Sequence, residues 1–203
     1  MSTTKATKPL GGRAYGSIPH VPGSKLGPGE HTIHDGQMRL LTSRSRSAAD
    51  WLCCEEKLDG SNVAVAKVNG ELHALTRAGY PATSSPYEQH HLFALWVLQN
   101  SGRFDELLGE GERVCGEWLA QAHGTRYVLS HEPFVPFDIM RGNQRALREE
   151  FWGRTEKHGF VQPQVIFVGK PILLDYLLQR LDHSGHGAVG PAEGFVWRLE
   201  SGG

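Results

Sequence analysis

The feature that most constrains this chain is the stretch from Glu55 to Asn62, where a lysine stands between two strand-like runs. Residues 51–54 form a short β-prone run, Lys57 comes soon after it, and Asp59-Gly60 is a turn signal. A second run with alternating side chains, residues 63–68, begins almost at once. The pattern predicts strand, tight turn, strand, with the lysine at the end of the first strand and facing a pocket that the sheet covers.

A lysine in such a pocket is a candidate nucleophile. Its amine attacks only in the unprotonated form, which a pocket favours by excluding water or by placing a cation nearby. Read alone, these few residues also fit a hairpin whose lysine is simply solvated. The choice between the two interpretations therefore depends on the rest of the chain.

The segment Lys57-Leu58-Asp59-Gly60 resembles the K-x-D-G signature of the covalent nucleotidyltransferases, which include ATP-dependent DNA ligases, RNA ligases and mRNA capping enzymes. Four further elements follow in the order typical of that superfamily, and the resemblance is closest to its RNA-ligase branch. They are Arg77 after a predicted strand, Glu117 in Gly116-Glu117-Trp118, Phe137 in residues 134–139 and Glu193 in residues 192–198. The resemblance covers the chain from about Trp51 to Arg198.

The resemblance implies a role for each residue near the lysine. Lys57 is the residue that becomes joined to AMP from ATP, and Asp59 orients this lysine or a metal-bound water. Either Glu55 or Glu56 accepts a hydrogen bond from the adenine amino group, and the sequence does not choose between them.

Five residues farther along are implied to hold the rest of the nucleotide and its metal. Asn62 and Arg77 contact the phosphates or the ribose, and the ring of Phe137 stacks on the base. Glu117 contacts the ribose or the metal, and Glu193 serves the metal or the phosphate side. Mg²⁺ is the expected metal because it prefers carboxylate and phosphate oxygens.

The full reaction implied by the resemblance has three steps and uses RNA with 5'-phosphate and 3'-hydroxyl ends. AMP is transferred to Lys57, then to the 5'-phosphate, and the 3'-hydroxyl finally attacks to seal the strand. Three alternatives stay open: a non-catalytic module that binds nucleotides or RNA ends, a DNA ligase-like enzyme, and a GTP-using capping enzyme.

One departure from the family pattern concerns phosphate contacts. The family has a further strand with two basic residues after the element around Glu193, whereas Arg198 is the single cation after Glu193 in this sequence. Loss of charge-assisted contacts, each worth roughly 1.5 to 3 kcal/mol, predicts a step that is slower by about one to four decades. We therefore expect this 203-residue form to be impaired as a ligase.

Composition sets the class and the domain plan. With 39% hydrophobic and 21% charged residues and a net charge of −1, the chain is typical of a soluble globular protein without a global basic field. We expect a Gly/Pro-rich, partly ordered leader over residues 1–48 and a nucleotidyltransferase domain over residues 49–203. Intermingled helices and mainly antiparallel strands predict an α+β fold, and the resemblance implies an ATP-grasp-like domain with flanking helices.

Two further features bear on location. The three cysteines form no disulfide pattern, and the N-terminus lacks the apolar segment of a secretory signal, which favours the cytoplasm. No membrane partner is expected, and the sequence leaves the oligomeric state open.

Other elements are expected from local patterns. Ser85 is predicted to cap a helix with Pro86 at its first position, with an apolar face that includes Leu92, Leu95 and Leu98. A helix is also predicted over residues 144–158, with Leu147 facing inward, and a short buried strand over residues 165–168.

Overall fold

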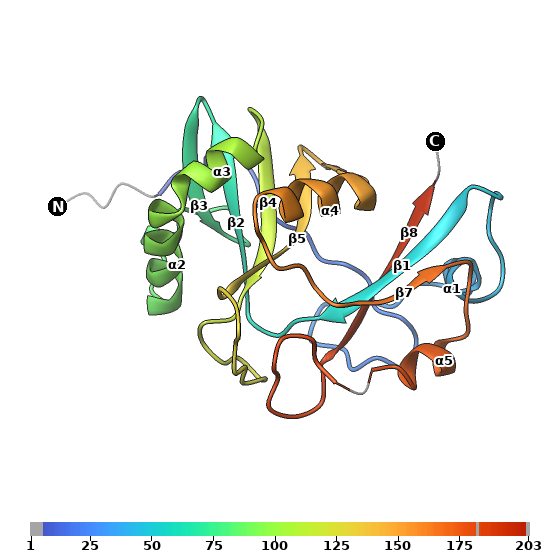
Figure 1. Ribbon diagram of the computed structural model, residues 1–203. Coiled ribbons are helices and arrows are strands. Elements are labelled where there is room, and N and C mark those ends of the chain that lie inside the picture. Colours follow the sequence, from blue (N-terminus) through green and yellow to red (C-terminus); the bar gives the residue numbers. More distant parts are fainter. Residues whose placement is uncertain (1–5, 182, 202–203) are drawn as a thin grey trace. The chain divides into compact units, whose positions relative to one another are not determined.

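The chain is seen here in a computed structural model, which describes residues 6–181 and 183–201. Helices and strands follow one another without a regular alternation (Figure 1). In chain order the elements are α1 (Asp35–Thr42), β1 (Asp50–Lys57), β2 (Ser61–Val68), β3 (Glu71–Thr76), the 3₁₀ turn η1 (Ala82–Ser84), α2 (Glu88–Gln99), α3 (Ser101–Leu107), β4 (Glu112–Trp118), β5 (Phe134–Arg141), β6 (Gln144–Arg145), α4 (Arg148–Lys157), β7 (Val165–Gly169), α5 (Leu174–Leu178) and β8 (Gly194–Ser201).

The elements divide into two compact units, each with its own antiparallel sheet. Unit 1 comprises residues up to 16 and residues 59–162, and its five strands lie in the order β3-β2-β4-β5-β6. Unit 2 comprises residues 17–58 and residues from 163 onward, and its three strands lie in the order β7-β1-β8. This mixture of helices with antiparallel sheets confirms the predicted α+β class. No helix in the described ranges is long and apolar enough to cross a membrane.

Both strands predicted around the lysine are present, but they do not form a hairpin. β1 pairs with β7 and β8, whereas β2 pairs with β3 and β4. The prediction of a strand pair was wrong because the Asp-Gly signal marks a change of direction without specifying which strands pair. The turn instead carries the chain from the sheet of one unit to the sheet of the other.

In unit 1, one face of the five-stranded sheet carries the apolar core. Side chains from β2, β4 and β5 pack there against the helices α2, α3 and α4. The helix α2 buries Phe93 and Val97, while Leu92, Leu95 and Leu98 are exposed. The predicted inward face was therefore wrong for these three leucines, since residues 92–98 are all apolar and the pattern does not single out a face.

Two other local expectations about helices in unit 1 were also wrong. The helix α2 begins after Tyr87, and the Ser85 hydroxyl contacts His90 Nδ1 at 2.6 Å rather than capping the helix. Residues 144 and 145 form the short strand β6, so the predicted helix begins only at Arg148, and Leu147 is exposed.

The opposite face of this sheet is covered in part by the N-terminal segment, residues 10–16. The backbone amides of Ala14 and Tyr15 donate to Arg77 O at 3.0 and 3.3 Å. Both residues are buried, and the Tyr15 hydroxyl donates to Asp138 Oδ2 at 2.7 Å. A Cβ at Gly79 would lie 1.9 Å from the carbonyl oxygen of Gly12, so a glycine is required where this segment crosses.

In unit 2, β1 is the central strand, and Leu52, Cys53 and Cys54 are fully buried. The strand β7 was predicted to be buried, yet Val165 and Val168 are exposed. β7 lies at an edge of its sheet, and edge strands bury less of their surface than central ones.

Candidate active site

Lys57 and Glu193 lie in direct contact in unit 2. Lys57 is the last residue of β1, and its register partner in β8 is Gly194, so the preceding residue, Glu193, is brought beside it. An ion pair joins Lys57 Nζ to Glu193 Oε1. The two side chains are 36% and 33% exposed, which leaves the amine accessible to a bound molecule.

The two glutamates before the lysine lie in different environments. Since side chains alternate along a strand, Glu55 shares a face of β1 with Lys57 and Glu56 points to the other face. Glu55 Oε2 lies 3.3 Å from Arg198 Nε, while Glu56 Oε2 accepts from Gly185 N at 2.9 Å. Strand geometry therefore distinguishes two residues that the sequence left as alternatives.

In unit 1, Asp59 and Glu117 fix the turn that leads into β2. Asp59 Oδ2 accepts from Gly124 N at 2.8 Å, and the backbone amide of Asp59 donates to the hydroxyl oxygen of Tyr127 at 2.9 Å. Glu117 Oε1 accepts from Gly60 N at 3.2 Å. A Cβ at Gly60 would lie 2.5 Å from the Trp118 carbonyl oxygen, so the glycine of the Asp-Gly pair is needed for close packing.

Asn62 and Arg77 line one cavity of about 520 Å³ in unit 1. The backbone amide of Arg77 donates to Asn62 O at 3.1 Å, which joins the two residues. Asn62 Oδ1 is buried and has no hydrogen-bond partner among the described residues. His90 lines the same cavity, and burial, together with the nearby His123 and His91, lowers the pKa of its imidazole. The cavity thus holds a buried acceptor that a ligand donor can satisfy.

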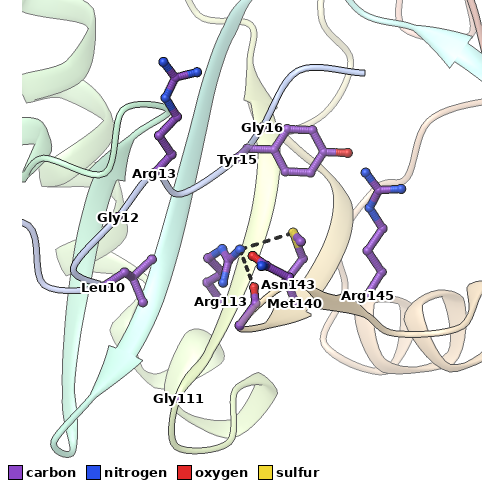
Figure 2. Close-up of a pocket in the computed structure, with 11 residues that line it drawn as sticks. Leu10, Gly12, Arg13, Tyr15, Gly16, Gly111, Arg113, Met140, Asn143 and Arg145 are labelled. Atoms are coloured by element: carbon purple, nitrogen blue, oxygen red, sulfur yellow. Dashed lines mark hydrogen bonds between the residues drawn. The ribbon is translucent and has the colours of Figure 1, made fainter. Parts of the chain in front are cut away.

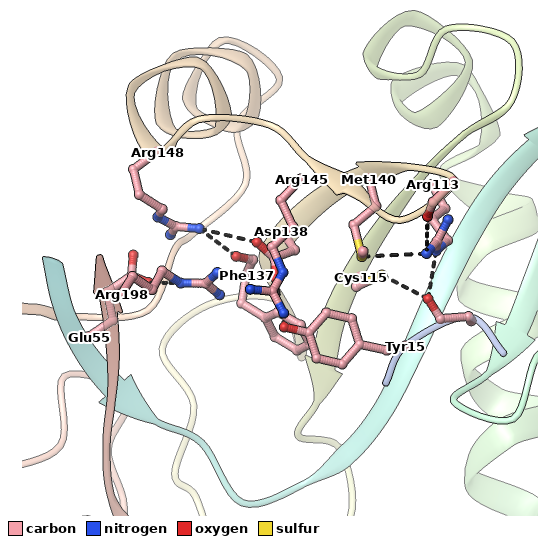
Figure 3. A network of polar contacts seen from close by, with 12 residues as sticks. Tyr15, Glu55, Arg113, Cys115, Phe137, Asp138, Met140, Arg145, Arg148 and Arg198 are labelled. Carbon is pink, nitrogen blue, oxygen red and sulfur yellow. Dashed lines mark hydrogen bonds and ion pairs between the residues drawn. The ribbon is translucent and has the colours of Figure 1, made fainter. Parts of the chain in front are cut away.

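Phe137 is partly exposed on a mostly buried strand, β5. Its ring packs edge-on against Tyr15, with centroids 5.0 Å apart, and its carbonyl oxygen accepts from Arg148 Nη1 at 2.6 Å (Figure 3). A phenylalanine in a strand is usually a core residue. Its partial exposure here is what a ring needs in order to stack on a bound base.

Tyr15 contacts Phe137 and Tyr127 contacts Asp59, and neither tyrosine was predicted from the sequence. Each is brought there by a loop or a terminal segment that is distant in sequence, so no local pattern marks it. The structure joins Lys57 with Glu193 in unit 2, and Asn62 with Arg77 in unit 1. The assignment of these residues to a reaction stays a prediction.

Two antiparallel sheets, and a lysine at a strand end followed by Leu-Asp-Gly, agree with the resemblance to the covalent nucleotidyltransferases. Within that class, the chain belongs to the RNA ligase family, whose model matches residues 51–202. No curated protein matches it.

Solved structures of RNA ligases resemble the fold of this chain. An archaeal ATP-dependent RNA ligase has 21% identity and a TM-score of 0.51, over 72% of this chain and 37% of that one. A Naegleria gruberi RNA ligase with pyrophosphate has 14% identity and a TM-score of 0.61, over 80% of this chain and 48% of that one. A lysine-to-alanine mutant of the Naegleria enzyme with ATP and Mn has 13% identity and a TM-score of 0.62, over 82% and 50%. The chain thus spans half or less of the length of these structures, and they confirm a nucleotidyltransferase fold.

Proposed function

We propose that this protein is an ATP-dependent RNA ligase that forms a covalent lysyl-AMP intermediate on Lys57. It acts in the cytoplasm in RNA repair and joins 5'-phosphate to 3'-hydroxyl RNA ends. The observation that carries the proposal is the accessible Lys57 at the end of β1, held against Glu193 by the register of β1 and β8. Membership of the RNA ligase family supports it.

In the first step, the Lys57 amine attacks the α-phosphorus of ATP. A P–N bond forms, the bond to the bridging oxygen breaks, and pyrophosphate leaves with that electron pair. The lysine must also lose a proton, and Glu193 is a carboxylate in direct contact with Nζ. Glu55, which shares the strand face of Lys57, is the proposed acceptor for the adenine amino group.

Residues of unit 1 are proposed to hold the rest of the nucleotide. Phe137 is partly exposed and offers its ring for stacking, and Asn62 offers a buried oxygen without a partner among the described residues. Arg77 is exposed at the cavity that Asn62 lines, where a guanidinium suits phosphate. Asp59 acts by fixing the turn after Lys57, through its hydrogen bond to Gly124.

Mg²⁺ fits the chemistry of the two carboxylates that the resemblance assigns to it, Glu193 and Glu117. Within the described ranges, no three His, Cys, Asp or Glu side chains are grouped to hold a metal alone. Mg²⁺ commonly binds through one or two carboxylates together with substrate phosphates, so these carboxylates suit it. When bound, the metal would neutralise charge that develops on the phosphates.

Intact-mass spectrometry after incubation with ATP and Mg²⁺ tests the proposal. We expect the wild type to gain the mass of one AMP. Lys57→Arg should show no gain, because the guanidinium is not nucleophilic. Lys157→Arg, at an exposed lysine of α4, is the matched control and should react like the wild type. A gain that persists in Lys57→Arg, or no gain in folded wild type at saturating ATP, would contradict the proposal.

Joining assays then address the substrate. Nicked and single-stranded RNA with 5'-phosphate ends are compared with the same strands in DNA. We expect RNA to be joined in preference to DNA. ATP binding without adduct or joining would instead indicate a non-catalytic binding module.

A further inference from the structure

A second cavity in unit 1, of about 540 Å³, is lined by three arginines and by no acidic residue. It lies on the sheet face that the N-terminal segment covers. Figure 2 shows Arg113 at its centre beside Met140 and Asn143, with Arg13 and Arg145 on either side. Four glycines also line the cavity, so backbone is exposed to it.

Arg113 is the central feature of this cavity. It lies on β4, is only 6% exposed and has no carboxylate within ion-pair distance among the described residues. Its Nε donates to Ala14 O at 2.6 Å, and its Nη2 donates to Gly142 O at 2.8 Å. These carbonyls fix the plane of the guanidinium and leave Nη1 without a partner in the described chain (Figure 3). A buried cation without a counter-ion is costly, and a bound anion offsets that cost.

The neighbours of Arg113 fit an anion as well. Asn143 provides an amide beside it, and Arg145 carries a second guanidinium that is partly exposed. Arg145 Nε lies 3.5 Å from Asp138 Oδ2, but this carboxylate also accepts from Tyr15 and lies 3.7 Å from Arg148 Nη1. The negative charge of Asp138 is thus shared among several donors and does not neutralise Arg113.

We propose that this cavity binds a phosphate group of the RNA strand. The inference rests on the proposed function, because RNA is the substrate of a ligase. Arg113 lies apart from Glu117, since the two are four residues apart on β4, about 13 Å at the usual rise of a strand. The cavity adjoins the proposed stacking residue, because Tyr15 in its lining packs against Phe137. Contacts to phosphate alone fix the place of the strand on the protein but do not select its sequence.

The test measures binding of a 5'-phosphorylated, fluorescently labelled single-stranded RNA by anisotropy at several salt concentrations. Arg113→Gln removes the central charge, and Arg13→Gln tests the rim without disturbing the core. Arg141→Gln is the matched control, because Arg141 lies on β5 outside the cavity with a side chain that is 65% exposed. Circular dichroism establishes that each variant is folded, and lysyl-AMP formation is measured on all of them.

We expect Arg113→Gln to bind RNA about tenfold more weakly and to lower the salt slope by about 0.7, as for one lost phosphate contact on a single strand. Arg13→Gln should lose about two- to fivefold, as is typical of an exposed charge. Arg141→Gln should bind as the wild type does. Lysyl-AMP formation should be unchanged in all three variants.

Two outcomes would overturn the inference. In the first, folded Arg113→Gln and Arg13→Gln bind RNA with the affinity and the salt slope of the wild type. The proposed function would still hold in that case if lysyl-AMP forms. The second outcome comes from measuring the binding of inorganic phosphate and pyrophosphate to the same variants. If these bind in an Arg113-dependent way while RNA affinity does not depend on Arg113, the cavity serves a free anion. Absence of lysyl-AMP in the wild type is a separate result, which contradicts the proposed function.

Discussion

Arg148 is the largest fully buried side chain of the described chain, and it hydrogen-bonds the backbone of Phe137. Its guanidinium donates to the Phe137 carbonyl oxygen at 2.6 Å, lies 3.7 Å from Asp138 Oδ1 and sits 4.2 Å from the centroid of the Phe151 ring. One residue of α4 thus holds the backbone of the proposed stacking residue, balances a buried carboxylate and packs on an aromatic ring. The sequence shows only an arginine at a helix start, where a solvated role is typical.

Replacing Arg148 with methionine is expected to lower stability by about 3 kcal/mol, because it leaves a buried carboxylate and a carbonyl oxygen with fewer donors. For a chain of this size, that loss corresponds to a melting temperature lower by about 6 to 12 °C. Arg141→Met, at the exposed arginine of β5, should stay within about 0.5 kcal/mol of the wild type. Calorimetry on both variants checks the prediction, and equal melting temperatures would show that Arg148 is not needed for the buried network.

At the scale of elements, the positions of strands were predicted from the sequence better than the positions of helices. They were also predicted better than which strands pair with one another. Alternation of side chains over residues 63–68 identified β2 within two residues, and the strand predicted before Arg77 is β3, because alternation records burial of one face. Pairing of β1 with β8 depends on residues more than a hundred positions apart, which no local pattern records. The helix α1 was missed because His34, rather than a more usual capping residue, caps it through Nδ1.

The same limit applies to the candidate site. The order of its residues was visible as a family pattern, whereas the contact of Lys57 with Glu193 follows from strand register. The choice between Glu55 and Glu56 also required the direction of each side chain. Tyr15 lies in a segment that was expected to be a partly ordered leader, and its burial depends on a sheet face that forms far along the chain.

The N-terminal segment provides a test at this scale, because its passage over the sheet depends on Gly79. Gly79→Ala places a Cβ 1.9 Å from the Gly12 carbonyl oxygen, so the segment must move away. Gly70→Ala is the matched control: both glycines have positive φ, at +87° and +76°, but nothing lies within 4 Å of a Cβ at Gly70. Both substitutions therefore carry the backbone strain of about 1 to 2 kcal/mol, and only the first adds the clash.

Limited trypsin digestion reports on this difference, because Arg13 lies within the segment. We expect cleavage after Arg13 to be at least tenfold faster in Gly79→Ala than in Gly70→Ala, with mass spectrometry identifying the site. Equal cleavage rates in the two variants would mean that the segment does not depend on the close approach at Gly79.

At the scale of the whole molecule, each unit is assembled from segments that are discontinuous in sequence. The chain passes between the units after residues 16, 58 and 162, so neither unit can be cut out as one segment. Both units contain cysteines: Cys53 and Cys54 lie in β1 of unit 2, and Cys115 lies in β4 of unit 1. None of the three is in a disulfide, and all three are fully buried.

These thiols are expected to be unreactive in the native protein and to become reactive when either sheet opens. Burial raises the pKa of the Cys115 thiol to about 12 and that of the Cys54 thiol still further, so the reactive thiolate is scarce near neutral pH. At pH 8 the Cys115 thiol therefore stays protonated, and burial also blocks the reagent. Labelling with Ellman's reagent should therefore detect no fast-reacting thiol in the native chain and all three cysteines in denaturant. Cys115→Ala assigns the signal of unit 1, and fast labelling of any native cysteine would show that its sheet is open in solution.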